Sequence, residues 1–108
     1  MISKKDNKRI LELADAILAL KTRNEAKRFL RDLLTEKELI EFGNRWKAAR
    51  MLSQSVLYTE IEKETGLSST TVARVSKWLN AGKGGYKLIL KKINISHHNL
   101  SHAGKGLC

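Results

Sequence analysis

The segment that most constrains the fold of this chain is residues 58–79, YTEIEKETGLSSTTVARVSKWL, which has the pattern of a helix-turn-helix. In this motif a short helix packs across a second helix, and the turn between them favours glycine because its φ is positive. Gly66 stands at the expected position of that turn. Apolar side chains on both helices and in the turn are expected to form the buried seam: Ile61, Leu67, Val72, Val75 and Leu79. The sequence therefore predicts a helix-turn-helix over about residues 58–80.

The remainder of the chain predicts further helices, because it contains no proline and repeats apolar residues at helical spacing. A broad apolar face marks a helix over about residues 5–20, and three glycines precede a last short helix that ends near residue 93. Capping boxes, in which a threonine and a glutamate three residues later bind each other's free amides, are expected at Thr22–Glu25, Thr35–Glu38 and Thr59–Glu62. The expected fold is all-α, with about six helices in one domain over residues 1–93.

Residues 94–108, NISHHNLSHAGKGLC, lack a sustained apolar face and are predicted to form a disordered tail. Three histidines and Cys108 lie in it, but a flexible tail offers no neighbouring groups to orient metal ligands, so no metal site is expected. A single cysteine cannot close an intrachain disulfide, which fits a reducing compartment. The chain also lacks a signal-peptide pattern and an apolar run of about 18 residues, so it is expected in the cytoplasm with no membrane partner.

Basic residues dominate the C-terminal part of the chain. The formal net charge is +10, and residues 65–108 contain seven lysines and arginines and no aspartate or glutamate. Residues 1–64 are mixed, with 14 basic and 11 acidic side chains. A field of one sign attracts polyanions and supplies the salt-dependent share of nucleic-acid affinity. The alternative is a solvated basic surface that has no polyanionic partner.

The outward side of the second helix of the motif is suited to DNA. Short hydroxyl side chains fill its first turn and Ala73 follows, so this helix can approach base edges closely. Lysines beside it are expected to contact phosphates, which position a protein without reading sequence. The alternative is a plain helical hairpin whose serines and threonines merely cap helices. The predicted DNA-binding residues are Thr59, Lys63, Ser68, Ser69, Thr70, Thr71, Ala73 and Lys77.

Three segments together resemble the Trp repressor family, and in particular its YerC/YecD-type members. They are LTEKELIEFGNRWKAARML at 34–52, TEIEKETGLSSTTVARVS at 59–76 and WLNAGKGGYKLIL at 78–90, within a resemblance that covers about residues 10–93. The resemblance implies an all-α homodimer in which the N-terminal helices and the last helix interlock with the partner. It also implies binding to double-stranded DNA, as helix-turn-helix proteins such as the Trp repressor do. The broad apolar face of the first predicted helix fits such a dimer.

The resemblance implies a small-molecule site as well. Thr35, Arg45 and Arg74 match positions that surround L-tryptophan in the family, where the two arginines flank the indole. Val75 and Trp78 replace a glycine and a serine of that site, and both changes add volume. We therefore expect Trp78 to fill much of this effector pocket, with L-tryptophan not acting as corepressor and no other cofactor required. The alternative is that Trp78 packs in the ordinary core while a different, unknown effector uses the arginines.

The function expected from these features is a sequence-specific, homodimeric transcriptional regulator of the bacterial cytosol or nucleoid. Repression is the simplest mode, because a small protein with this single module can act by occluding a promoter. The alternative function is a helix-turn-helix protein-interaction or RNA-associated structural module without operator specificity. The sequence predicts no enzyme, since it shows no paired carboxylates and no Ser-His or Cys-His arrangement of the kind that catalysis uses.

Overall fold

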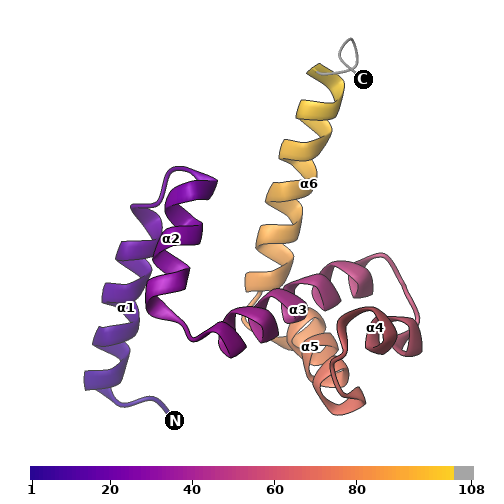
Figure 1. The fold of residues 1–108 in the computed structure, drawn as a ribbon, viewed down its shortest axis with the longest axis horizontal. Coiled ribbons are helices and arrows are strands. Elements are labelled where there is room, and N and C mark those ends of the chain that lie inside the picture. The colour runs from indigo at the N-terminus through magenta and orange to yellow at the C-terminus, as the bar shows by residue number, and fades with distance from the viewer. Residues whose placement is uncertain (104–108) are drawn as a thin grey trace. The chain divides into compact units, whose positions relative to one another are not determined.

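The structure, a computed structural model, describes the backbone of residues 1–103 and the side chains of residues 1–94. This part of the chain contains six α-helices and no strand (Figure 1), so the predicted all-α fold is confirmed. The helices are α1 (Lys4–Leu18), α2 (Arg23–Leu33), α3 (Glu36–Ser53), α4 (Tyr58–Thr65), α5 (Ser69–Ala81) and α6 (Gly85–Ala103).

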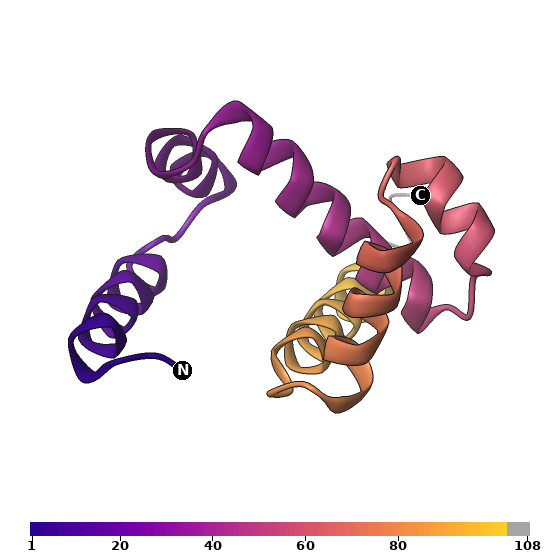
Figure 2. The same cartoon turned by 90° about the horizontal axis from the view of Figure 1, so that it is seen from below.

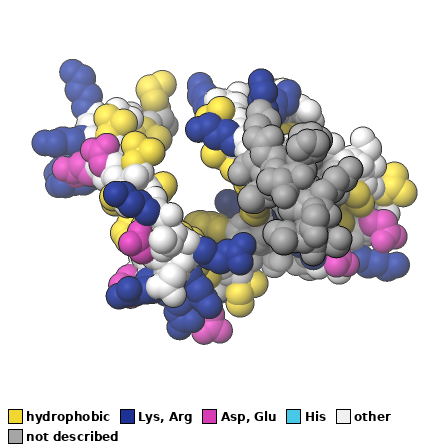
Figure 3. All heavy atoms as spheres, turned by 90° about the horizontal axis from the view of Figure 1, so that it is seen from above, with side chains coloured by type: hydrophobic (Ala, Val, Ile, Leu, Met, Phe, Trp, Pro, Cys, Tyr) yellow, Lys and Arg dark blue, Asp and Glu magenta, His cyan; other side chains and the backbone are white. Residues whose placement is uncertain are grey.

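The chain divides into two compact units, Met1–Ile40 and the part from Glu41 onward. The first unit contains α1, α2 and the start of α3, and no residue of α1 or α2 is buried within the chain. Large apolar side chains are exposed on both helices, and hydrophobic groups are visible on their surface at the left of Figure 3. They include Ile10, Leu11, Ile17, Leu18, Leu30 and Leu33.

Threonine caps open α2 and α3, as the sequence predicts. At α3 the box is reciprocal: Thr35 Oγ1 accepts a hydrogen bond from Glu38 N at 3.1 Å, and Glu38 Oε1 accepts one from Thr35 N at 2.9 Å. These bonds stabilise the ionised carboxylate and lower the pKa of Glu38 from its ordinary value. At α2, Thr22 Oγ1 accepts from Glu25 N, while the Glu25 carboxylate reaches the amide of Lys21 instead of that of Thr22.

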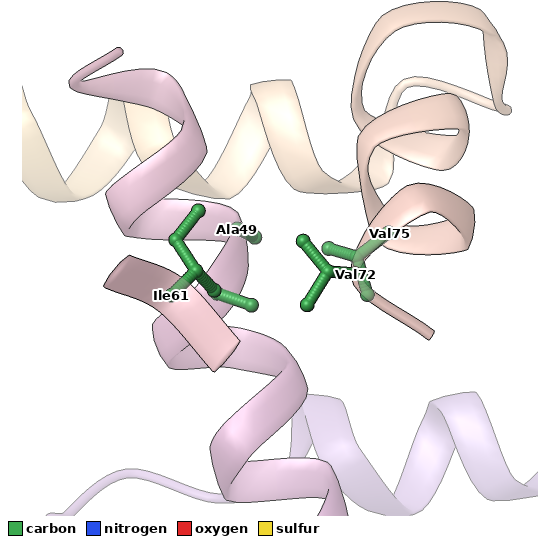
Figure 4. Packing of buried hydrophobic residues seen from close by; sticks show 5 residues of the cluster. Ala49, Ile61, Val72 and Val75 are labelled. Carbon is green, nitrogen blue, oxygen red and sulfur yellow. The ribbon is translucent and has the colours of Figure 1, made fainter. Parts of the chain in front are cut away.

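The buried core of the second unit joins three helices. Ile61 of α4 and Val72 and Val75 of α5 are fully buried and point toward Ala49 of α3 (Figure 4). Helix α5 also packs against α6, and the two lie side by side in both views (Figure 1 and Figure 2). The five apolar positions predicted for the seam are buried or half-buried, because their spacing keeps them on the facing sides of α4, the turn and α5.

Two aromatic side chains support this core from its edge. Trp46 of α3 and Tyr86 of α6 are stacked, with ring centroids 6.2 Å apart and an interplanar angle of 25°. Both pack against the buried cluster as half-buried residues. This contact holds the first turn of α6 against α3. It therefore anchors the chain directly after the loop that joins α5 to α6.

The third predicted capping box is wrong. Helix α4 begins at Tyr58 with Leu57 as its N-cap, and no side chain caps it. Leu57 is extended, and its carbonyl oxygen accepts hydrogen bonds from the amides of Glu60 and Ile61. Because the helix starts before Thr59, that threonine lies inside the first turn and is not the cap.

Helix α6 continues beyond the end expected near residue 93 and reaches Ala103. No glycine or proline occurs between residues 86 and 103, so nothing local stops the helix before Gly104. The remaining part of the predicted tail, residues 104–108, lies outside the described residues.

Candidate nucleic-acid interface

The turn between α4 and α5 is fixed by a glycine and a buried threonine. Gly66 has φ 73° and ψ 4°, the left-handed conformation that the sequence predicts, and its amide donates to Glu62 O at 2.8 Å. Thr65 is buried: its hydroxyl donates to Ile61 O at 2.7 Å and accepts from Leu67 N at 3.2 Å. This role of Thr65 was not predicted from the sequence. The signal that could have indicated it is a hydroxyl residue directly before the turn glycine. The turn therefore holds α5 at a fixed angle to α4.

A pair of hydroxyl groups organises the start of α5. Ser68 is the N-cap, and its Oγ accepts from Thr71 N at 3.1 Å. The same hydroxyl donates to Thr71 Oγ1 at 3.0 Å, and Thr71 is half-buried. The hydroxyl hydrogen of Thr71 is then still available to an acceptor on a ligand. Ser68 and Thr71 thus form one ordered polar unit at the N-terminus of α5.

The face of α5 away from the core is polar and made of small side chains. Ser69, Thr70 and Ala73 are exposed, and Lys77 follows them one turn further along. A helix with such short side chains can enter the major groove of B-DNA, which is about 12 Å wide, without steric conflict. The structure therefore brings Ser69, Thr70, Ala73 and Lys77 together on one accessible surface, whereas Thr71 lies half-buried at its edge.

Helix α4 presents the two other predicted contacts. Thr59 and Lys63 are exposed and lie one helical turn apart, so they share a face of the helix. The first amides of α4 have no side-chain cap, and a helix N-terminus carries a partial positive charge. Phosphate groups are bound favourably at such an end.

The charge of this surface is positive on α5 and mixed on α4, where Lys63 lies among Glu60, Glu62 and Glu64. No acidic residue occurs from residue 65 onward, and Arg74 and Lys77 are exposed on α5. On the neighbouring part of α4, the Glu64 carboxylate is paired with Lys47 of α3 at 3.3 Å. This pair reduces the negative potential that α4 would otherwise add beside the reading face.

The predicted effector residues are brought together in part. The Arg45 guanidinium lies 5.7 Å from the centroid of the Trp78 ring and 5.4 Å from that of Phe42, and it forms an ion pair with Glu41 at 2.8 Å. Its Nε is buried and has no hydrogen-bond partner among the described residues. Val75, in contrast, is fully buried in the core.

Trp78 is more exposed than its spacing suggests. It lies three residues after buried Val75, yet 40% of its surface is accessible within the chain. It forms one wall of an open cavity of about 700 Å³, together with Trp46, Lys83 and Tyr86. Trp78 therefore occupies part of a hollow surface and leaves the rest of it open.

The two other effector residues are placed differently. Arg74 is exposed on α5. Among the described residues, Arg45 and not Arg74 makes a cation–π contact with the Trp78 ring. Thr35 belongs to the first unit, where it caps α3. The small-molecule pocket stays a prediction.

No helix in residues 1–103 combines the length and apolar character that crossing a membrane requires. Among the described side chains, no group of three histidine, cysteine, aspartate or glutamate residues is placed to hold a metal ion.

The chain is similar to known proteins over most of its length. The family model described as Trp repressor protein matches residues 8–94. An uncharacterized protein YerC of Bacillus subtilis (strain 168) is 38% identical over 92 residues, which are 85% of this chain and 88% of that protein.

Two crystal structures share the fold. A TrpR-like protein from Eubacterium eligens ATCC 27750 has a TM-score of 0.76 and 33% identity over 81% of this chain and 90% of that one. A putative Trp repressor from Staphylococcus aureus has a TM-score of 0.76 and 39% identity over 82% of this chain and 88% of that one. The proteins of this family share a regulatory fold, and the family is not one of enzymes. Membership suggests that a chain is a helix-turn-helix DNA-binding regulator. The chain belongs to the Trp repressor family.

Proposed function

We propose that this chain is a sequence-specific transcriptional regulator that binds double-stranded DNA as a homodimer. The observation that carries the proposal is the exposed face of α5, where small hydroxyl side chains follow a glycine-fixed turn and a basic flank adjoins them. A plain helical hairpin would need its Ser and Thr residues only as caps, whereas Ser69 and Thr70 cap nothing in the described structure.

The proposed roles divide into reading and positioning. Ser69, Thr70, Thr71 and Ala73 would face base edges, where hydroxyl groups bond to bases and methyl groups contact thymine. The cap residue Ser68 supports them by orienting Thr71. Phosphates would be bound by Thr59, Lys63 and Lys77 on either side of the groove.

The apolar surface of the first unit and membership of the family both support the proposed dimer. Ile17 and Leu18 of α1 are 49% and 80% exposed within the chain, and Leu33 of α2 is 46% exposed. Apolar surface on this scale is normally covered by a partner. In a two-fold dimer the two α5 helices would read half-sites about 10 base pairs apart, as in other helix-turn-helix proteins, the Trp repressor included.

Repression is the proposed direction of regulation. The family model that matches residues 8–94 is described as Trp repressor protein, and a helix-turn-helix dimer bound across a promoter can block access to it sterically. A bound dimer would act by occluding a promoter in the bacterial cytosol or nucleoid.

The test is a selection of bound fragments from genomic DNA, followed by binding measurements on the enriched sequence. Ala73→Glu places a negative charge on the reading face and should abolish enrichment. Ala81→Glu adds the same charge at the exposed end of α5 and should preserve it. Recovery of no shared sequence, or equal loss from both substitutions, would contradict the proposal and favour a protein-interaction or RNA-associated role.

A further inference from the structure

A second cavity of the unit from Glu41 onward lies between the loop after α3 and helices α5 and α6. Its volume is about 790 Å³, within the range of about 300 to 1,000 Å³ that is typical of small-molecule sites. Leu79 and Leu90 line it and are 7% and 8% exposed, so they form an apolar floor. Val56 and Leu57 of the loop extend this apolar surface. We call this cavity the α5–α6 groove.

The α5–α6 groove is separate from the site of Arg45 and Trp78. On α5 it is lined by Leu79 at its floor and by Ser76 and Asn80 at its rim, and each of the two rim residues is two positions from Trp78. Residues two apart lie about 160° from each other around a helix. The rim of the groove and the Trp78 surface therefore lie on opposite flanks of α5, and the residues that line the two cavities are different.

The wall contributed by α6 is cationic. Lys87 and Lys91 line the groove one helical turn apart, and neither forms an ion pair with any described side chain. No aspartate or glutamate is among the described residues that line it. Two unneutralised ammonium groups beside an apolar floor favour an anion that carries an apolar body.

The rim offers hydrogen-bonding groups that suit the same ligand. Asn80 Nδ2 donates to Ser76 O at 2.9 Å, which fixes the amide, and its oxygen accepts no hydrogen bond from the side chains that the structure describes. The Tyr58 side chain lines the cavity from the first turn of α4 and is 44% exposed. Ser55, also in the lining, adopts the left-handed conformation with φ 62°. A non-glycine residue in that conformation costs energy and is found at functional sites as well as at helix ends.

We propose that the α5–α6 groove binds a small organic anion whose carboxylate, or a similar group, pairs with Lys87 and Lys91. The apolar body of the ligand rests on Leu79 and Leu90. Because one wall of the groove belongs to α5, the ligand touches the helix that carries the proposed reading residues. A regulatory effect on DNA binding rests on the proposed function, whereas binding of the anion does not.

The experiment measures binding of decanoate to the full chain without DNA, by calorimetry and by amide chemical shifts. Decylammonium, with the same chain and opposite charge, is the comparator. Saturable decanoate binding is expected, with shifts at Leu79 and Leu90, and no binding of decylammonium. The double substitution Lys87→Gln and Lys91→Gln should weaken decanoate binding about tenfold, as loss of two exposed charge contacts does. Lys4→Gln with Lys5→Gln removes the same charge from exposed positions of α1 and should change nothing.

Several results would overturn the proposal. If the Lys87/Lys91 variant and the Lys4/Lys5 variant bound decanoate equally well, the groove lysines would not be contacting the anion. If decanoate and decylammonium bound equally well, the groove would not select for negative charge. Dissociation of a dimer by decanoate in sedimentation would show that a second copy of the chain covers the groove. Loss of DNA affinity in the Lys87/Lys91 variant, with decanoate binding unchanged, would assign these lysines to DNA phosphates. Because the substituted lysines are exposed, the variants are expected to fold.

Discussion

Replacement of Trp78 by alanine tests how far this side chain substitutes for a bound ligand. Trp78 is 40% exposed, so about three fifths of a side chain of about 250 Å² is covered, or about 150 Å². At about 25 cal/mol per Å² this burial stabilises the fold by about 4 kcal/mol. Extended-chain references overstate burial by roughly 10–40%, and alanine keeps its Cβ contacts, so Trp78→Ala should cost about 2 to 3 kcal/mol.

The assay is denaturant unfolding followed by circular dichroism at matched protein concentrations, since the stability of a dimer depends on concentration. Trp78→Phe keeps an aromatic face for Arg45 and should cost about 1 kcal/mol. A cycle with Arg45→Ala should give a coupling energy of about 0.5 to 1 kcal/mol between the two side chains. A loss below about 0.5 kcal/mol for Trp78→Ala would show that the ring is not packed.

The same experiment extends to the ligand. If Trp78 occupies the space that the family gives to an indole, the unmodified protein should not bind L-tryptophan in a calorimetric titration, and its DNA affinity should not depend on L-tryptophan. Saturable binding that strengthens DNA affinity would refute this reasoning. The unpartnered Nε of Arg45 would then mark the polar end of that ligand site.

Four further substitutions test the interface and its supports. Thr71→Ala should change base preference at one position of the DNA site and cost about 1 to 3 kcal/mol, whereas Lys77→Ala should weaken binding to all sequences alike; a panel of single-base variants separates the two, and equal, sequence-blind losses would remove Thr71 as a reader. Ser55→Gly should raise the free energy of unfolding by about 0.5 to 1 kcal/mol, because glycine adopts φ 62° without strain; lower stability in denaturant unfolding would contradict this. Thr35→Ala should destabilise the fold by about 1 kcal/mol at neutral pH. The lowered pKa of Glu38 means that the stabilisation by the Thr35 box is present above the ordinary carboxyl pKa and is lost as pH falls through the folded-state value. The difference from the unmodified protein should therefore shrink in acid, and a constant difference would speak against the box.

Local patterns predicted the parts of this fold that local chemistry determines. The Thr35 box and the Gly66 turn each depend on residues within four positions, so the sequence was sufficient to find them. The seam of α4 and α5 was predictable because its spacing is that of a helix face. Leu57 as the N-cap of α4 was not, since its side chain gives no capping signal and the helix start depends on backbone geometry.

Features that depend on tertiary packing could not be read from the sequence. The spacing of Trp78 places it near the buried side of α5, but its exposure depends on how closely α3 and α6 approach that flank. The α5–α6 groove likewise combines residues from Leu52 to Asn94 that no sequence window contains. The helix positions of the eight residues expected to bind DNA follow from the sequence pattern, and DNA binding by these residues stays a prediction.

The most direct test of the proposed function is the salt dependence of binding to the selected DNA sequence and to a shuffled duplex of equal length. Fluorescence anisotropy over a range of potassium chloride concentrations gives both affinities. The logarithm of affinity should fall with the logarithm of salt concentration by about 0.9 for each phosphate contacted, on both duplexes. The selected sequence should be bound at least about 1,000-fold more tightly at physiological salt. A flat salt dependence, or equal affinity for the two duplexes, would contradict sequence-specific DNA binding.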